Sequence, residues 1–154
     1  MNGYVLFRLG DRRFVTKLDE VREIVRLSGL ETLPGMRPPL AGVVVLRGAP
    51  LPVLDVRAAD VVGTDGGDVL VMDVEGDAVG IAVDQVLAVL GADELQGAEP
   101  PAKALPSYVV GVRRDANGPL LLVDLHVLLD VTTEGWRAAL AEQVSIDVRS
   151  RAQT

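Results

Sequence analysis

The sequence contains no cysteine and only one histidine, His126. Without cysteine the chain can form neither disulfides nor thiolate metal sites, a composition that fits a cytoplasmic protein. A single histidine without cysteine also makes a histidine-based metal centre or a cysteine–histidine catalytic pair implausible. The apolar neighbours of His126 instead predict a residue of a strand or of a helix start.

Long hydrophobic runs and positive charge are lacking too. No apolar stretch reaches the ~18 residues that a membrane-spanning helix needs, and the first residues, MNGYVLFRLGD, do not resemble a signal peptide. A net charge of −7 argues against a nucleic-acid-binding protein, which needs a basic face. With 49% hydrophobic but only 3% aromatic residues, the 154-residue chain can bury a core built from Val, Leu, Ile and Ala.

Catalytic motifs are also missing. The glycine-rich segment 63–67 lacks the Lys-Ser or Lys-Thr of a phosphate-binding loop, and no serine lies in a nucleophile-elbow motif. Asp55, Asp84 and Asp124 fall at predicted strand ends, where capping or turn hydrogen bonds explain them better than paired-carboxylate catalysis. We therefore expect a protein that is not an enzyme and that has no cofactor and no metal site.

Short strands dominate the pattern of the first half. Alternating or β-branched runs predict strands over 4–9, 13–18, 21–27, 42–46 and 51–56. The last two form a hairpin with Arg47 at its tip, which is either a binding residue or a solvated turn arginine. Val21 and Glu23 share one strand face, which is either an interface edge or an ordinary exposed face.

The second half repeats the order of these signals. Asp19-Glu20-Val21 matches Asp84-Gln85-Val86 at an offset of 65, and Gly42-Val43 matches Gly111-Val112 at an offset of 69. Two β-meanders can look alike by chance, but the kept spacing favours a duplication. At the offset of 69, Arg47 falls opposite Ala116. Units with about five short strands fit small closed barrels, which leave no exposed sheet edge.

The end of the chain changes to a helical period. Thr133 can cap a helix in which Trp136, Ala139, Leu140 and Val144 share one face, so we expect an amphipathic helix over about 133–146. We expect one domain over 1–154. Its approximate subdomains are 15–85 and 86–130 plus 1–14.

Several segments resemble the CheW family, the coupling proteins of bacterial chemotaxis. Leu46-Arg47-Gly48 followed by PVLDVR at 52–57 is similar to the family signature N-L-R-G…P-V-x-D-L-R. FRLGD at 7–11, VREI at 21–24 and VGIAVDQV at 79–86 are similar to further family segments in the same order. Val45 stands where the family usually has Asn, which concerns the partner more than the fold.

The resemblance implies a mainly β fold of two five-stranded SH3-like β-barrel subdomains with a C-terminal helix. It also implies a cytoplasmic, non-enzymatic adaptor that joins the histidine kinase CheA to methyl-accepting chemoreceptors in membrane-associated arrays. It implies neither nucleic-acid binding nor membrane insertion. By position in the family motifs, Val21 and Glu23 are candidate kinase-binding residues, and Gly42 and Arg47 are candidate receptor-coupling residues.

Two alternatives stay open. The chain could be a CheW-like module for another kinase array, such as a pilus-type system, or a free-standing kinase regulatory domain. A small-molecule-binding barrel or enzyme would need a pocket in which polar groups converge.

Overall fold

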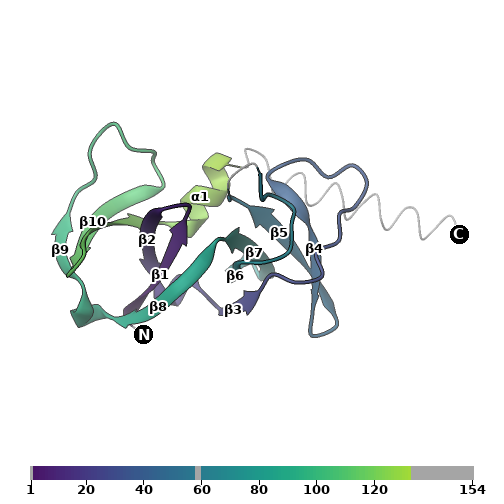
Figure 1. Cartoon of the computed structure of the whole chain (residues 1–154), viewed down its shortest axis with the longest axis horizontal. Coiled ribbons are helices and arrows are strands. Elements are labelled where there is room, and N and C mark those ends of the chain that lie inside the picture. The colour runs from purple at the N-terminus through teal and green to yellow at the C-terminus, as the bar shows by residue number, and fades with distance from the viewer. Residues whose placement is uncertain (1, 58–59, 133–154) are drawn as a thin grey trace, which may run out of the picture.

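The computed structural model describes residues 2–57 and 60–132, which form mainly β-strands (Figure 1). The strands of the first half are β1 (Gly3–Leu9), β2 (Arg12–Lys17), β3 (Glu23–Arg26), β4 (Leu40–Leu46) and β5 (Ala49–Asp55). Those of the second half are β6 (Asp68–Val74), β7 (Asp77–Val83), β8 (Gln85–Gly91), β9 (Gln96–Glu99), β10 (Val109–Asp115) and β11 (Gly118–Val123). The short 3-10 helices η1 (Leu18–Glu20) and η2 (Ala92–Glu94) and the helix α1 (Leu125–Thr132) complete the described part.

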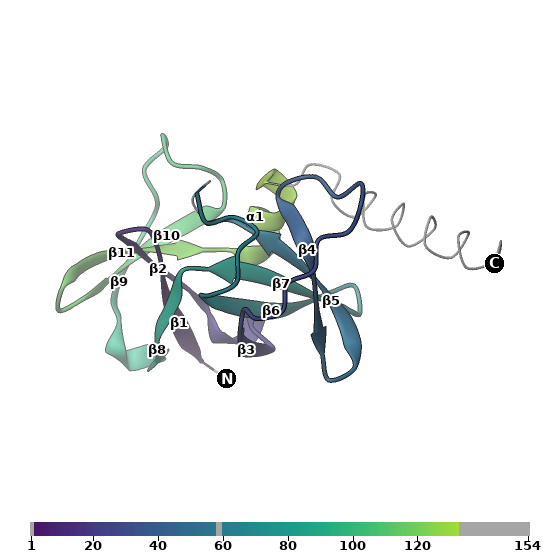
Figure 2. The same ribbon diagram turned by 45° about the vertical axis from the view of Figure 1, so that its right-hand side comes forward.

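The strands form two sheets that lie side by side in both ribbon views (Figures 1 and 2). One has the strand order β8-β1-β2-β11-β10-β9 and the other the order β3-β6-β7-β5-β4. The prediction of a mainly β fold with two β subdomains is confirmed, with six strands in the first sheet because β9 adds an edge. The helix predicted over about 133–146, including its cap Thr133, lies outside the described residues.

Each sheet combines strands from both sequence repeats. β1 and β2 join the strands β8 to β11, whereas β6 and β7 join β3, β4 and β5. The pairings match between repeats: β2 runs parallel to β11 as β7 runs parallel to β5. The isolated bridge of Glu31 with Val43 likewise corresponds to the pairing of Glu99 with Val112. The duplication predicted from the sequence is thus present, with its first hairpins exchanged.

The chain passes from one sheet to the other at two points. The first lies between Lys17 and Glu23 and the second between Val83 and Gln85. The division expected from the sequence falls at residues 14–15, within β2, and at residues 85–86, at the start of β8.

The described residues form three apolar clusters, of which one holds the two sheets together. The central cluster lies between them and includes Leu70 and Met72 of β6, the stacked rings of Phe7 and Phe14, and Leu129 of α1. Each of the two smaller clusters packs against one of the two sheets. Because β6 has Val69 and Val71 in one cluster and Leu70 and Met72 in another, the strand is buried on both faces, which explains its continuous apolar sequence.

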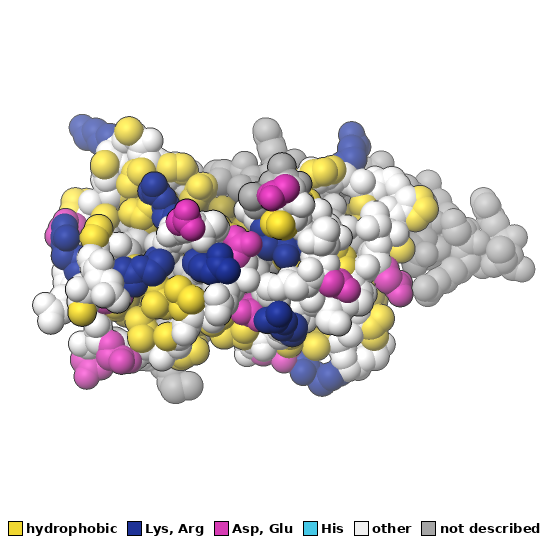
Figure 3. Space-filling model, in the orientation of Figure 1, with side chains coloured by type: hydrophobic (Ala, Val, Ile, Leu, Met, Phe, Trp, Pro, Cys, Tyr) yellow, Lys and Arg dark blue, Asp and Glu magenta, His cyan; other side chains and the backbone are white. Residues whose placement is uncertain are grey.

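The surface mixes charges of both signs. On the face seen in Figure 3, basic and acidic side chains are interspersed and separated by apolar ones. In the part of the chain that is described, no helix has both the length and the apolar character to cross a membrane.

Candidate interaction surface

The hairpin of β4 and β5 holds Arg47 in a defined position at its tip. Leu46 pairs with Ala49, so the turn consists of Arg47 and Gly48 alone. Both have positive φ angles, 49° and 81°, as a type I′ turn requires. A positive φ is uncommon for a residue with a side chain. The turn therefore sets the backbone conformation of Arg47. Its side chain is 66% exposed.

Arg47 forms an ion pair with Glu23. Its guanidinium donates to both carboxylate oxygens: Nη1 lies 2.9 Å from Oε2, and Nη2 contacts Oε1. Such two-point contacts are stronger and more directional than single hydrogen bonds. Glu23 belongs to β3 and Arg47 follows β4, and these strands are the opposite edges of the five-stranded sheet. The pair therefore joins the two edges.

The ion pair keeps both groups charged. The hydrogen bond from Arg47 lowers the pKa of Glu23, and the nearby charge of Arg22 acts in the same direction. The hydrogen bond to Glu23 raises the pKa of Arg47. Glu23 is only 24% exposed, so a partner that reaches it also meets Arg47. Two residues predicted to serve different partners thus lie in direct contact.

Gly42 has a structural reason to be glycine. It is buried in β4 at a register shift, with a φ of 155°. A Cβ atom at this position would collide with the backbone carbonyl of Glu31. That close approach allows Glu31 and Val43 to exchange two backbone hydrogen bonds of 2.8 Å. Gly42 therefore allows β4, the first strand of the hairpin, to pair closely with the segment of Glu31.

Val21 and Val45 each lie two residues before a member of the ion pair, Glu23 and Arg47. Val21 is half-buried and packs against the central cluster just before β3, so it positions the strand that carries Glu23. Val45 is 68% exposed, the most exposed large hydrophobic side chain of the described residues. Val45 and Arg47 together give the hairpin an apolar and a cationic contact group.

A buried ion pair that the sequence reasoning missed lies at the other end of β5. Asp55 and Arg57 are 4% and 7% exposed, and Nη2 of Arg57 lies 2.8 Å from Oδ2 of Asp55. Arg57 also donates to the carbonyls of Thr64 and Gly66, and Asp55 accepts the N–H of Gly63. Burial alone would raise the pKa of Asp55, but the hydrogen bonds from Arg57 and Gly63 outweigh it and lower the pKa.

The other two strand-end aspartates also bond to turns and caps, as predicted. Asp84 accepts the N–H of Gly10 at 2.7 Å, and Asp124 accepts the N–H of Val127 at 3.1 Å as the cap of α1. His126 lies at the start of this helix, which confirms its predicted place. Asp124 matches Asp55 in the repeat, and the offset of 69 also places His126 opposite Arg57. The sequence signal that could have revealed the buried pair is the spacing of Asp55 and Arg57, which lie two residues apart at the end of an apolar strand.

The hollows in the described part of the surface are open rather than enclosed. Two hollows of about 470 and 570 Å³ are lined mostly by charged and polar side chains, unlike the apolar lining typical of small-molecule pockets. Among the described residues, Glu20, Asp124 and His126 form the group whose side chains could hold a metal ion.

Comparison with known proteins agrees with the resemblance noted in the sequence. The family model of the CheW-like domain matches residues 3–133. The chain is 24% identical over 135 residues to a chemotaxis protein CheW of Treponema pallidum, covering 80% of this chain and 79% of that protein. It is 33% identical over 92 residues to a probable chemotaxis protein CheW of Rhizobium etli, covering 56% and 58% of the two chains.

The fold is also similar to a solved structure. The scaffolding protein TtCheW of Thermoanaerobacter tengcongensis superposes with a TM-score of 0.67 at 23% identity, covering 84% of this chain and 92% of that one. The match of the family model to most of the chain shows that this protein belongs to the CheW-like domain family.

Proposed function

We propose that the chain is a non-enzymatic coupling protein that joins a CheA-like histidine kinase to the cytoplasmic tips of methyl-accepting chemoreceptors. It would act in the cytoplasm, recruited to membrane-associated receptor arrays. The family membership supports the scaffold role, and the relatives' names support chemotaxis. The observation that carries the proposal is the contact between Glu23 and Arg47, because it joins the two predicted partner sites.

The geometry favours adjoining rather than separate partner surfaces. Val21 and Glu23 belong to the segment assigned to the kinase, and Gly42 and Arg47 to the segment assigned to the receptor. The ion pair brings these segments together across the edges of one sheet. A rigid sheet that presents adjoining sites can hold two partners close without any catalytic group.

The chain offers a matched pair for testing this surface. Arg47 bonds Glu23, and Arg114 bonds Glu99 on the β9–β10 edge of the other sheet, with both side chains of the second pair about half exposed. Purified chain should capture the host's CheA-like kinase and receptor cytoplasmic fragments in a pull-down. We expect Arg47→Glu to reduce capture and Arg114→Glu to leave it unchanged.

Thermal melts separate a lost contact from a lost fold. Exposed ion pairs contribute little to stability, so both variants should melt within ~2 °C of the wild type. Capture of neither partner by the wild type would contradict the proposed function. Equal losses from the two arginine variants would contradict the assignment of the surface.

One observation favours a second candidate function. Val45, in place of the family's asparagine, is exposed beside Arg47, so this hairpin offers its partner an apolar contact instead of an amide. Such a change suits a CheW-like module of another kinase array, such as a pilus-type system. Capture of a kinase that does not bind chemoreceptor fragments would favour this alternative.

A further inference from the structure

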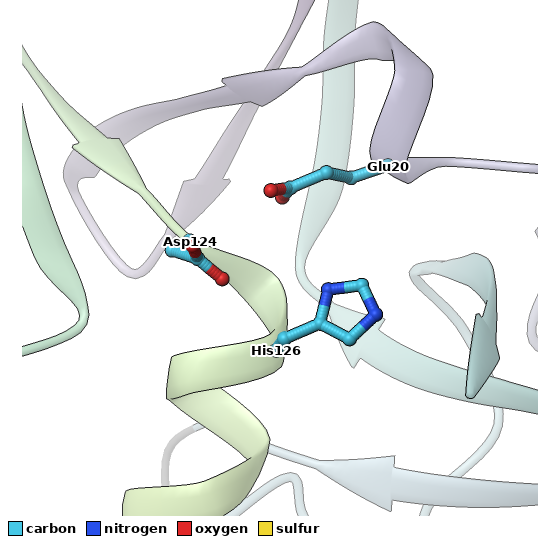
Figure 4. Close-up of side chains that lie close together, drawn as sticks. All are labelled: Glu20, Asp124 and His126. Atoms are coloured by element: carbon cyan, nitrogen blue, oxygen red, sulfur yellow. The ribbon is translucent and has the colours of Figure 1, made fainter. Parts of the chain in front are cut away.

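Three side chains of metal-binding type meet at the start of α1. Glu20 ends η1, Asp124 directly precedes α1, and His126 is the second residue of the helix. One ligand atom from each lies within 4.8 Å of the other two. Figure 4 shows both carboxylates and one ring nitrogen turned toward a common space.

Each carboxylate uses one oxygen for the fold and leaves the other available. Oδ1 of Asp124 accepts the N–H of Val127, and Oε2 of Glu20 accepts the hydroxyl of Thr16 at 3.0 Å and the N–H of Leu125 at 3.3 Å. Within residues 2–57 and 60–132, neither second oxygen accepts a hydrogen bond. Capping therefore explains why the carboxylates are held in place, but it does not involve the imidazole.

The hydrogen bond on the far side of His126 assigns its tautomer. Nε2 lies 3.3 Å from the backbone oxygen of Asp73. A carbonyl only accepts hydrogen bonds, so Nε2 carries the hydrogen and Nδ1 of the neutral ring carries a lone pair. Nδ1 is the nitrogen that faces the carboxylates in Figure 4. Metal-binding histidines are commonly oriented in this way, with the second nitrogen bonded to a carbonyl.

The surroundings favour a cation. The open hollow of about 470 Å³ beside the group is lined by Lys17, Asp19, Glu20, Arg22, Asp73 and His126. Arg22 is paired with Asp73 at 3.1 Å. With Asp124, four carboxylates thus lie near two cationic side chains, so negative groups outnumber positive ones around the space between Glu20 and Asp124. Its openness leaves room for water to complete a coordination shell.

We propose that Glu20, Asp124 and His126 bind a divalent transition-metal ion. Two carboxylate oxygens and one imidazole nitrogen, without a thiolate, suit an ion such as Zn²⁺ with water in its open positions. Tetrahedral bonds of about 2.0–2.2 Å would place the ligand atoms roughly 3.3–3.6 Å apart, a distance that side-chain rotation can reach from the present separations of 4.8 Å or less. The ion would tie η1, which leads into the strand of Glu23, to α1.

The test is calorimetric titration of the full chain with ZnCl₂ alone after treatment with a chelator. We expect one saturable site and a melting temperature that rises with Zn²⁺ concentration. His126→Ala and Asp124→Asn should each weaken binding by at least ~10-fold. Asparagine caps helices as well as aspartate does, so Asp124→Asn should melt like the wild type when no metal is present.

Asp19→Asn is the matched control, because it removes a carboxylate from the same hollow but no ligand. Its affinity should stay within about twofold of the wild type, since it lacks a direct metal contact. The proposal is overturned by an absence of saturable binding, by wild-type affinity in His126→Ala, or by an equal loss in Asp19→Asn and Asp124→Asn. None of these outcomes depends on the capture of kinase or receptor.

Discussion

At the scale of single residues, two ion pairs of the five-stranded sheet differ sharply in burial. Asp55 and Arg57 are buried at the end of β5, where they bond one another and the loop that follows. Glu23 and Arg47 are accessible at the edges of the same sheet. The buried pair supports the fold, whereas the exposed pair is available to a partner.

The buried pair predicts a specific dependence of stability on pH. Because the pKa of folded Asp55 lies below its unfolded value of about 3.9, its stabilisation is complete above that value and is lost as the pH falls through the folded pKa. Asp55→Asn leaves Arg57 buried without its counter-charge and should cost about 3 kcal/mol at pH 7. Urea unfolding from pH 7 to 2 measures both effects. The difference between variant and wild type should shrink below pH 4; a constant difference would contradict the assignment.

At the scale of elements, the β4–β5 hairpin has a turn that requires positive φ angles, and one of its two positions is occupied by an arginine. A type I′ turn favours Asn-Gly, because asparagine tolerates a positive φ better than most side chains. Arg47 occupies the asparagine position at a φ of 49°. The turn alone therefore does not explain the arginine, whereas its contact with Glu23 gives it a role in this structure.

Arg47→Asn should separate turn stability from function. We expect the melting temperature to stay equal or to rise, because the turn gains its preferred residue. Capture of the receptor fragment should fall, because the guanidinium is lost. A clear drop in melting temperature would show that Arg47 is retained mainly for folding.

At the scale of the whole molecule, the exchange of hairpins between the repeats makes the two sheets interdependent. β1 and β2 complete the sheet of the second repeat, and β6 and β7 complete that of the first. The strand pairings of the two repeats match, but the exposed ion pair occurs in only one of them. The offset of 65 places Ala88 opposite Glu23, and the offset of 69 places Ala116 opposite Arg47. The repeats thus share a framework, and only the first carries the candidate interaction surface.

The exchange predicts that neither half folds alone. Fragments cut in the segment 60–67 should each lack cooperative unfolding by circular dichroism, because each loses a hairpin from the centre of its sheet. Mixing the two fragments should restore a single transition, since the central cluster contains residues from both. Cooperative unfolding of either fragment by itself would contradict this interdependence.

The sequence predicted features that depend on local pattern. Alternation and β-branched runs placed the strands, turn residues placed the hairpin of Arg47, and repeated spacing revealed the duplication. Contacts between distant segments could not be predicted in this way. Glu23 and Arg47 meet only because the sheet curls until its opposite edges, β3 and β4, approach each other. Glu20 meets His126 only because η1 and α1 converge, so the number of histidines in the sequence could not predict this group.

The central claim is that this chain joins a kinase to a receptor. The most direct test mixes the chain with the host's CheA-like kinase and a receptor cytoplasmic fragment, and detects the ternary complex by size-exclusion chromatography. The wild type should elute with both partners. Arg47→Glu should lose the complex while Arg114→Glu keeps it, because only the first pair joins the predicted partner sites. A wild type that elutes alone, or an Arg47→Glu variant that assembles like the wild type, would contradict the account.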